Sequence, residues 1–360
     1  MQFTANETQS MLRDSVRRFV HKNGPATAEP GTTAPNAWPT FVGQGWLAAG
    51  IAEASGGLGG GAFDVCLIAE ELGRGLVREP FVPYAATGRL LASLGDSTLL
   101  EGLLWDGATP LLVHSESAAR GDSGFVETRA RQDGDAFLLT GSKSAILGGD
   151  LAGDYLVTAR QDDGTLGVFR IAANAPGVNA RSYRTIDNRR ATNVQLSTVE
   201  AEAIASGDEA EAAVLQAADL HLVAAAAEAV GTMQFALDTT RDYLNTRKQF
   251  GVTISQFQAL QHRLADMFIE TEMARSIVLR AAAAVDGDNA ALSRQLAAAA
   301  KARTGRAARF VGGQAVQLHG GIGVTEECVI GHCYKRLVAF DLAMGPGETH
   351  YDRFGGLAAS

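Results

Sequence analysis

Cysteine is scarce in this sequence, with three residues in 360, at positions 66, 328 and 333. An odd number of widely spaced cysteines gives no disulfide framework, so the sequence favours a reducing compartment. Cys328 and Cys333 lie near His319 and His332, but their spacing matches no zinc pattern. No metal site is therefore predicted.

Positive charge is also in deficit. The 31 lysine and arginine residues are outnumbered by 40 aspartate and glutamate residues, and the formal net charge of −9 argues against nucleic acid as a partner. No apolar run approaches the roughly 18–20 residues of a membrane span. The first residues lack the basic and apolar regions of a secretory signal. The sequence thus predicts a cytoplasmic protein with no membrane contact.

The chain does contain enough apolar material for a sizeable core, since 46% hydrophobic and 20% charged residues is an ordinary globular profile. Its length suggests two or three domains. The spacing of apolar residues is helical over residues 1–109, β-like over 110–205 and helical again over 206–360. These three segments are the predicted domains.

Local signals refine this division. The first helix is predicted to open with a capping box at Thr4 and Glu7, and residues 22–37 are predicted to be a loop. Short β-rich runs separated by Asp-Gly turns favour a sandwich or barrel. The predicted strands cover residues 111–115, 125–132, 136–140, 155–160, 166–171 and 194–196. The last helical segment is predicted to break at 286–289 and 319–323 and to end at Phe340, followed by a tail.

A glycine cluster at residues 56–61 invites comparison with a dinucleotide-binding loop of the Rossmann type. That motif follows a strand, however, and residues 47–55 are not β-branched. A flexible turn before the next helix is the better interpretation.

Residues 247–251, Arg-Lys-Gln-Phe-Gly, lie between two long helical patterns and are followed by Gln258. Cations and amide donors at a helix junction can bind an anion such as a phosphate, and Gly251 can adopt a positive φ. A solvated helix–helix corner with a buried phenylalanine fits the spacing as well. Both interpretations stay open on spacing alone.

Several segments, taken together and in order, resemble those of the acyl-CoA dehydrogenase family over nearly the whole chain. The matching segments are residues 57–59, 70–74, 229–231, 247–251, 258–259, 265–267 and 316–323. The resemblance implies an α+β multidomain fold with an N-terminal helical domain, a middle β domain and a C-terminal four-helix-bundle domain.

The resemblance also implies FAD as cofactor, an acyl-CoA thioester as substrate and an electron-transfer flavoprotein as redox partner. In the family, FAD lies across a subunit interface, and segments of this kind hold its adenosine and pyrophosphate from the neighbouring protomer. Arginine binds phosphate in a bidentate manner, and paired glycines admit an anion to the backbone. The predicted cofactor contacts are Arg247, Gln249, Phe250, Gln258, Gln317, His319, Gly320 and Gly321.

The catalytic base is where the chain departs from the family. The reaction removes a proton α to the thioester, and most members use a glutamate in a Glu-Gly-Thr motif near the C-terminus. Pro346 falls at that position and has no acid–base group. Two weak candidates remain: Glu348, and His221, which matches a base position on an earlier helix of other members. The base stays unassigned.

The site for the flavin ring departs as well. Residues 115–122 and 140–147 match the family's ring-binding loop and strand, and Gly141 and Lys143 are kept. Ala145, however, stands for the usual aromatic residue, and Leu147 for the hydroxyl that bonds the flavin. A leucine cannot replace that hydrogen bond.

The chain thus keeps segments that serve a neighbour's FAD and lacks parts of its own ring site. This pattern resembles the short subunit of an α2β2 hetero-oligomer that acts on sterol or bile-acid side-chain thioesters. The homologous partner subunit would then supply the glutamate. Two alternatives are a self-sufficient homo-oligomeric dehydrogenase with an unusual base and a non-catalytic, flavoprotein-like scaffold subunit.

Overall fold

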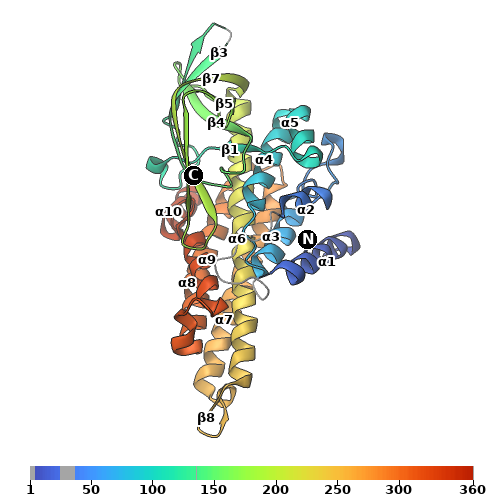
Figure 1. The fold of residues 1–360 in the computed structure, drawn as a ribbon, viewed down its shortest axis with the longest axis vertical. Helices are drawn as coiled ribbons and strands as arrows, with labels where there is room; N and C mark the ends of the chain where they lie inside the picture. The colour runs from blue at the N-terminus through green and yellow to red at the C-terminus, as the bar shows by residue number, and fades with distance from the viewer. Residues whose placement is uncertain (1–4, 25–36, 135, 360) are drawn as a thin grey trace. The chain divides into compact units, whose positions relative to one another are not determined.

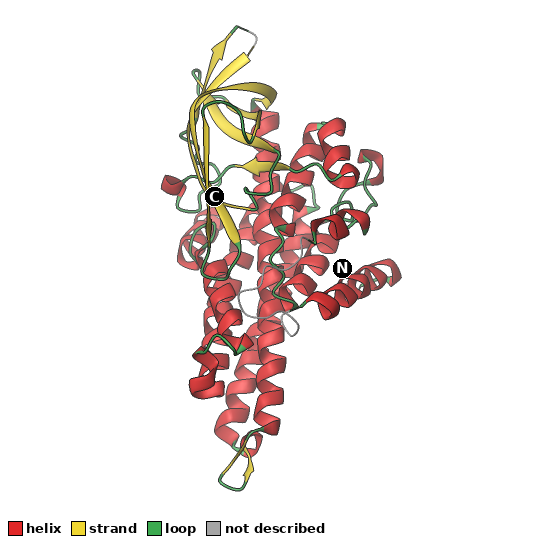
Figure 2. Ribbon diagram, viewed as in Figure 1, coloured by secondary structure: helices red, strands yellow, loops and turns green. Residues whose placement is uncertain are grey.

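The computed structural model describes residues 5–24, 37–134 and 136–359. Within them the predicted order of helical, β and helical segments is confirmed (Figures 1 and 2). The chain divides into two compact units. We call the described parts of residues 1–35, 66–77 and 222–360 the helical unit, and those of 36–65 and 78–221 the sheet unit. The domain boundaries at residues 109 and 205 stay predictions.

Short helices make up the first part of the chain. They are α1 (Glu7–Asn23), α2 (Trp38–Gly43), the 3₁₀ helix η1 (Glu53–Ser55), α3 (Ala62–Arg74), α4 (Phe81–Leu94), α5 (Ser97–Glu101) and the π-helix η2 (Gly102–Asp106). The predicted capping box at Thr4 and Glu7 is wrong, and Thr4 lies outside the described residues. Asn6 caps α1 instead, since its side chain accepts from the Gln9 backbone N–H and the Gln9 side chain accepts from that of Asn6.

The glycine cluster at residues 56–61 forms turns between η1 and α3. Gly57 and Leu58 donate backbone hydrogen bonds to Ala52 and Ala48, at 3.1 and 3.0 Å. No strand precedes the cluster, because residues 44–52 form turns. The cluster therefore lacks the strand–loop–helix context of a dinucleotide-binding loop.

Seven strands form one mixed sheet in the sheet unit. They are β1 (Pro110–Val113), β2 (Arg129–Asp133), β3 (Ala136–Leu147), β4 (Asp154–Gln161), β5 (Leu166–Ala172), β6 (Val178–Arg184) and β7 (Arg190–Ser206), with the 3₁₀ helix η3 (Ser117–Ala119) after β1. The pairing runs β4–β2–β3–β7–β5 and returns to β4. Closure of this kind leaves few unpaired edges and is typical of a barrel.

Strand β6 was not predicted. Its seven residues show no alternation of apolar and polar side chains, because only Val178 and Tyr183 are large and not charged or amide-bearing. None of the seven is buried. It pairs with β7 alone. Tertiary pairing along a long neighbouring strand, rather than local pattern, places such a strand.

Long helices follow the sheet. They are α6 (Asp208–Thr246), α7 (Gln258–Val285), α8 (Ala290–His319), α9 (Val329–Leu342) and α10 (Gly347–Ala359), with the short strands β8 (Lys248–Gln249) and β9 (Val252–Thr253) and the 3₁₀ helices η4 (Ile254–Gln256) and η5 (Gly320–Val324). Helix α8 packs against α7, α9 and α10. The prediction of a non-helical tail after Phe340 is wrong, because α9 runs on to Leu342 and α10 follows.

Helix α6 is long and apolar enough to cross a membrane by length and composition. However, 67% of its most apolar stretch is buried inside the protein. A buried core helix has the same composition. Its alanine-rich surface also permits unusually close packing by its neighbours.

That close packing is clearest where α3 meets α6 in the helical unit. Gly73 of α3 faces the α6 backbone at Glu228, and Gly231 of α6 faces the α3 backbone at Glu70. The Thr232 hydroxyl donates a hydrogen bond to the Gly73 carbonyl at 3.1 Å. A Cβ on Gly231 would lie 1.8 Å from the Glu70 carbonyl oxygen, well inside van der Waals contact. The two helices can approach this closely only because glycine stands at both positions.

We therefore expect Gly231→Ala to lower the free energy of unfolding of the helical unit by about 1–3 kcal/mol, since the helices must separate. Urea unfolding followed by circular dichroism measures the change. Gly313→Ala on α8 is the matched control, because its Cβ meets nothing within 4 Å. A Gly231→Ala variant as stable as the control variant would contradict the close approach.

Candidate cofactor site

The junction between α6 and α7 is a small β-hairpin. Lys248 pairs with Thr253 and Gln249 with Val252, and the Ile254 N–H donates to the Arg247 carbonyl at 2.9 Å. The turn residues Phe250 and Gly251 both have positive φ, 54° and 84°. This combination is typical of a two-residue type I′ turn, in which phenylalanine is strained. The sequence predicted a helix junction here but not the hairpin.

The hairpin presents its side chains to the outside. Phe250 is 90% exposed, so a phenylalanine buried at the junction is wrong, and its ring meets only the edge of Phe257 within the described chain. Arg247, Gln249 and Gln258 are exposed. Among the described residues, no side-chain hydrogen bond or ion pair engages any of these three. A guanidinium, two amides and an aromatic face are thus available to a bound molecule.

The end of α8 supplies the second group of predicted contacts. Gln317 is exposed, whereas His319 is only 6% exposed. The His319 ring stacks on Tyr243 with centroids 4.4 Å apart and planes 21° apart. Tyr243 lies one helical turn before Arg247, whose N–H donates to the Tyr243 carbonyl. The end of α8 therefore contacts α6 one helical turn before Arg247. Tyr243 was missed, because no local motif marks a contact across 76 residues.

The two glycines after His319 differ in what requires them. Gly320 has φ 67° and ψ −146°, a conformation open essentially to glycine alone. Gly321 has no positive φ, and a Cβ there would meet nothing of the chain within 4 Å. Because Gly321 has no side chain, its backbone is exposed to solvent and has free space beside it. A closely bound group can use both.

We call the residues predicted to contact the cofactor the cofactor corner: Arg247, Gln249, Phe250, Gln258, Gln317, His319, Gly320 and Gly321. Its unengaged donors and its open glycine fit a phosphate-containing nucleotide such as the adenosine and pyrophosphate of FAD. His319 is the exception, because its Nδ1 already bonds the Ala315 carbonyl at 2.8 Å. Its other ring nitrogen is the only one left for a ligand.

In the sheet unit, the lysine of the segment 140–147 is part of the interior. Lys143 is buried, and its Nζ donates to Glu116 Oε1 at 2.8 Å, to Thr158 Oγ1 at 3.0 Å and to the His114 carbonyl at 3.2 Å. Glu116 also accepts from the backbone N–H groups of residues 127 and 128. These hydrogen bonds hold the loop at residues 115–122 against β3. Neither charge is available to a ligand.

The segment that matches the flavin-ring strand has an irregular backbone. Ala145 has φ 56°, and its N–H donates to Asn193 Oδ1 at 2.9 Å, beside a shift in the β3–β7 register. Such bulges often aim side chains at functional sites. Here the bulge presents only a methyl group, and the half-buried Leu147 offers no hydrogen bond. Neither side chain can therefore hydrogen-bond a ligand.

Neither candidate base has the environment that proton abstraction requires. Burial, and then the Arg189 guanidinium, lower the pKa of His221 to about 4, so it is neutral but only weakly basic at neutral pH. Glu348 is exposed on the first turn of α10. The two residues belong to different units. Both stay weak candidates.

The loop around Pro346 is fixed by buried groups. His350 Nε2 contacts the Met344 carbonyl at 2.8 Å, and the Gly347 N–H donates to Asp341 Oδ1 at 3.4 Å. Lys301, which is buried, donates from Nζ to the Asp341 carbonyl at 3.0 Å. Because the loop is held from inside the bundle, Glu348 cannot move to the position of Pro346 without breaking these contacts.

Three histidines with lowered pKa values, of which His350 is fully buried, predict an acid-sensitive fold. Burial is the largest cause that lowers the pKa of His114, His221 and His350, each to about 4, from an ordinary value of 6.5. As the pH falls, the histidines of the unfolded chain are protonated before those of the folded chain. Their contribution to the free energy of unfolding is therefore fully present above about pH 6.5 and is lost as the pH drops toward 4. Thermal unfolding between pH 7 and 4 measures this loss. His350→Gln should make the decline shallower, and an unchanged melting temperature down to pH 4.5 would contradict it.

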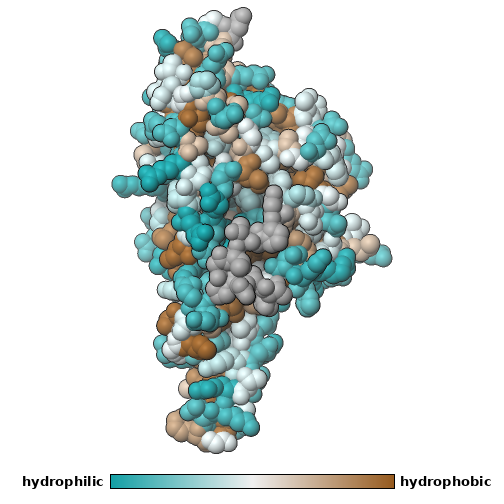
Figure 3. Space-filling view, viewed as in Figure 1, coloured by the Kyte–Doolittle hydropathy of each residue, from teal (hydrophilic) through white to brown (hydrophobic). Residues whose placement is uncertain are grey.

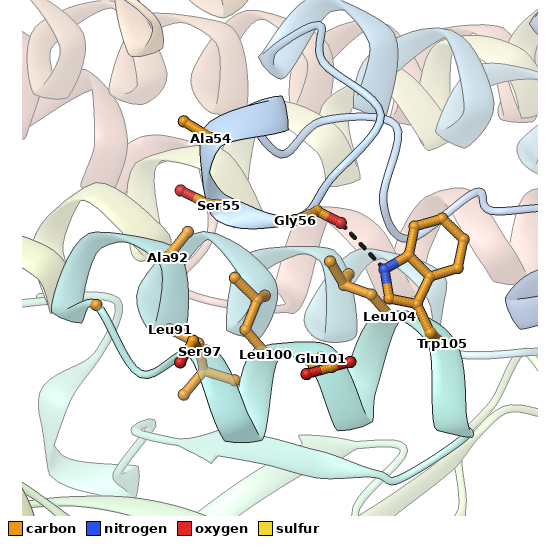
Figure 4. Close-up of a pocket in the computed structure, with 11 residues that line it drawn as sticks. Ala54, Ser55, Gly56, Leu91, Ala92, Ser97, Leu100, Glu101, Leu104 and Trp105 are labelled. Atoms are coloured by element: carbon orange, nitrogen blue, oxygen red, sulfur yellow. Dashed lines mark hydrogen bonds between the residues drawn. The ribbon is translucent and has the colours of Figure 1, made fainter.

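A separate hollow of about 540 Å³ lies in the sheet unit (Figure 4). Leu91, Leu100 and Leu104 line it, and the Trp105 indole N–H donates to the Gly56 carbonyl at 3.0 Å. It contains none of the predicted site residues. Among the described residues, no group of three or more histidine, cysteine, aspartate or glutamate side chains could hold a metal ion.

The chain has the fold class in which a β domain follows one helical domain and precedes another. The chain belongs to the acyl-CoA dehydrogenase family. The family's N-terminal domain matches residues 6–97 and its C-terminal domain residues 212–355. Members are oxidoreductases that act on the CH–CH group of acyl-CoA thioesters, and they use FAD.

Individual relatives cover nearly the whole chain. A probable acyl-CoA dehydrogenase, YngJ of Bacillus subtilis (strain 168), is 30% identical over 97% of both proteins. Among solved structures, a variant of the Tcur3481–Tcur3483 steroid ACAD is 29% identical, with a TM-score of 0.88 over 98% of each chain. The ChsE4–ChsE5 complex of Mycobacterium tuberculosis has the same fold, at 23% identity and a TM-score of 0.88 over 100% of this chain and 99% of the other.

Proposed function

We propose that this chain is a subunit of a hetero-oligomeric, FAD-dependent acyl-CoA dehydrogenase. In this proposal it contributes the adenosine and pyrophosphate contacts of the cofactor corner, and a homologous partner subunit supplies the catalytic glutamate. The single observation that carries the proposal is the contrast between an intact cofactor corner and a base position filled by Pro346.

The residues of the corner have distinct roles in this proposal. Arg247 binds the pyrophosphate, Gln249, Gln258 and Gln317 offer hydrogen bonds to the nucleotide, and Phe250 stacks against it. Gly320 and Gly321 bring backbone N–H groups close to the phosphates. When bound, FAD supplies the acceptor for the hydride that leaves the β carbon of the thioester.

Exposed apolar side chains support an assembly with another subunit. On α7, Phe268, Ile269 and Met273 are 51–53% exposed, and on η5 Val324 is 74% exposed. Figure 3 shows hydrophobic residues at the surface of the face it displays. All of these residues belong to the helical unit, which also carries the cofactor corner. Apolar patches of this kind are typical of protein–protein contacts.

A two-subunit assembly is proposed because two similar structures each carry a pair of protein names, Tcur3481–Tcur3483 and ChsE4–ChsE5. The Tcur3481–Tcur3483 protein is a steroid ACAD, so we propose a bulky sterol or bile-acid side-chain thioester as the substrate class here. An electron-transfer flavoprotein is the proposed electron acceptor, and the cytoplasm is the proposed location.

Coexpression with a candidate homologous subunit tests the proposal. The complex should contain flavin and oxidise a steroid side-chain CoA thioester with a dye as electron acceptor, whereas this chain alone should do neither at full level. Stoichiometric flavin together with full activity from this chain alone would overturn it. A complex that contains no flavin would favour a non-catalytic scaffold.

The self-sufficient alternative is tested on the same complex. His221→Gln and Glu348→Gln should each leave turnover within about twofold, since neither residue is the base in the proposal. A loss of several orders of magnitude in either variant would assign the base to this chain. The partner's glutamate replaced by glutamine is the matching positive control.

A further inference from the structure

The two halves of the cofactor corner come from segments that are distant in sequence, residues 247–258 and 317–321. Tyr243 contacts both. We propose that Tyr243 is a positioning residue that holds the two halves in register for the nucleotide. The inference rests on the proposed function, because it assumes that the corner binds FAD.

The contacts of Tyr243 support this role. Its ring stacks on His319 at 4.4 Å between centroids, and its hydroxyl donates to the His319 carbonyl at 3.4 Å. Its own carbonyl accepts from the Arg247 N–H at 2.9 Å. The Tyr243 side chain therefore holds His319, the residue before Gly320, and lies one helical turn before Arg247. If the Tyr243 and His319 rings shifted, the distance between the Arg247 guanidinium and the Gly320 backbone would change.

The stack also fixes what His319 can offer a ligand. The Ala315 carbonyl can only accept, so Nδ1 carries the proton and Nε2 keeps its lone pair. Burial lowers the pKa of His319, which favours this neutral form. Within the described chain Nε2 makes no hydrogen bond. A lone pair on Nε2 would repel a phosphate and would suit a donor, so His319 would accept from a hydroxyl or amino group of the nucleoside.

The experiment measures FAD affinity in the complex with its partner subunit. Flavin is removed, and FAD is titrated back while its fluorescence is followed. Tyr243→Leu removes the stack and should weaken FAD binding about tenfold. Tyr243→Phe keeps the ring and loses only a long hydrogen bond, so its affinity should stay within about threefold. Tyr183→Leu, an exposed tyrosine of the sheet unit, is the matched control and should bind FAD normally.

A second variant keeps the inference testable if Tyr243→Leu does not fold. His319→Leu removes the aromatic partner of Tyr243 together with the Nε2 acceptor, and FAD affinity should fall about tenfold. Thermal unfolding of the flavin-free complex, measured alongside, separates positioning from simple stability. Unchanged affinity in both variants would overturn the inference while leaving the proposed function intact. A wild-type complex that binds no FAD would overturn both.

Discussion

Replacing Lys143 by methionine is expected to destabilise the sheet unit by about 3–5 kcal/mol, because Glu116 would keep its charge in the interior without its cation. Lys143 is buried and donates to Glu116, Thr158 and the His114 carbonyl, and Glu116 in turn holds the backbone at residues 127 and 128. One substitution therefore disturbs β1, β3, β4 and the loop at 115–122. Urea unfolding at pH 7 measures the loss.

The double variant Lys143→Met with Glu116→Gln is the control. A neutral glutamine removes the unpaired charge and still accepts a backbone hydrogen bond, so the double variant should recover much of the stability lost by the single one. Lys335→Met removes a half-buried cation paired with the exposed Glu326 and should change the unfolding free energy by less than about 1 kcal/mol. A single variant at Lys143 as stable as wild type would contradict the buried pair.

The order of segments and the composition of the cofactor corner were predictable, because each depends on local pattern. Helical and β-like spacing follow from which faces are buried, and Arg247, Gln258 and the glycines at 320–321 are recognisable in order along the chain. The structure shows His319 stacked on Tyr243, one helical turn before Arg247. Whether the cofactor corner binds FAD stays a prediction.

What could not be predicted depends on contacts between distant residues or on backbone strain. The turn at Phe250 needs a positive φ that phenylalanine rarely adopts, so the sequence gives no hairpin signal. Tyr243 meets His319 only after α6 and α8 pack. Helix α10 forms in a glycine-containing segment because α8 packs beside it, and the buried His350 lies on α10. Tertiary packing overrides propensity at each of these places.

The erosion of the ring site was predicted residue by residue, and the structure adds a reason why it is not easily reversed. A hydroxyl at position 147 alone would not restore a ring site, because the β3 bulge at Ala145 still presents no aromatic side chain. A glutamate at position 346 would enter a loop held by His350 and Asp341. The departures therefore lie in two separate regions, the β3 bulge of the sheet unit and the loop before α10 of the helical unit.

Replacing Arg247 by alanine is expected to reduce FAD affinity of the complex by more than about 100-fold, since a bidentate, charge-assisted contact to a phosphate is lost. Arg247 is exposed and makes no side-chain bond within the described chain, so its removal leaves no partner unpaired and should not change stability. Flavin content after gel filtration and FAD titration of the flavin-free complex give the measurement.

Two further substitutions separate a specific phosphate contact from a general effect of charge. Arg247→Lys keeps the charge but not the planar fork, so it should recover only part of the affinity. Arg241→Ala removes a cation from the same helix, where it pairs with Asp238 and Asp242, and should bind FAD as wild type does. Equal losses from Arg241→Ala and Arg247→Ala would mean that the corner attracts the anion only through its overall field. A loss confined to Arg247 would instead place the phosphate at the hairpin, where Phe250 and Gln249 can also reach it.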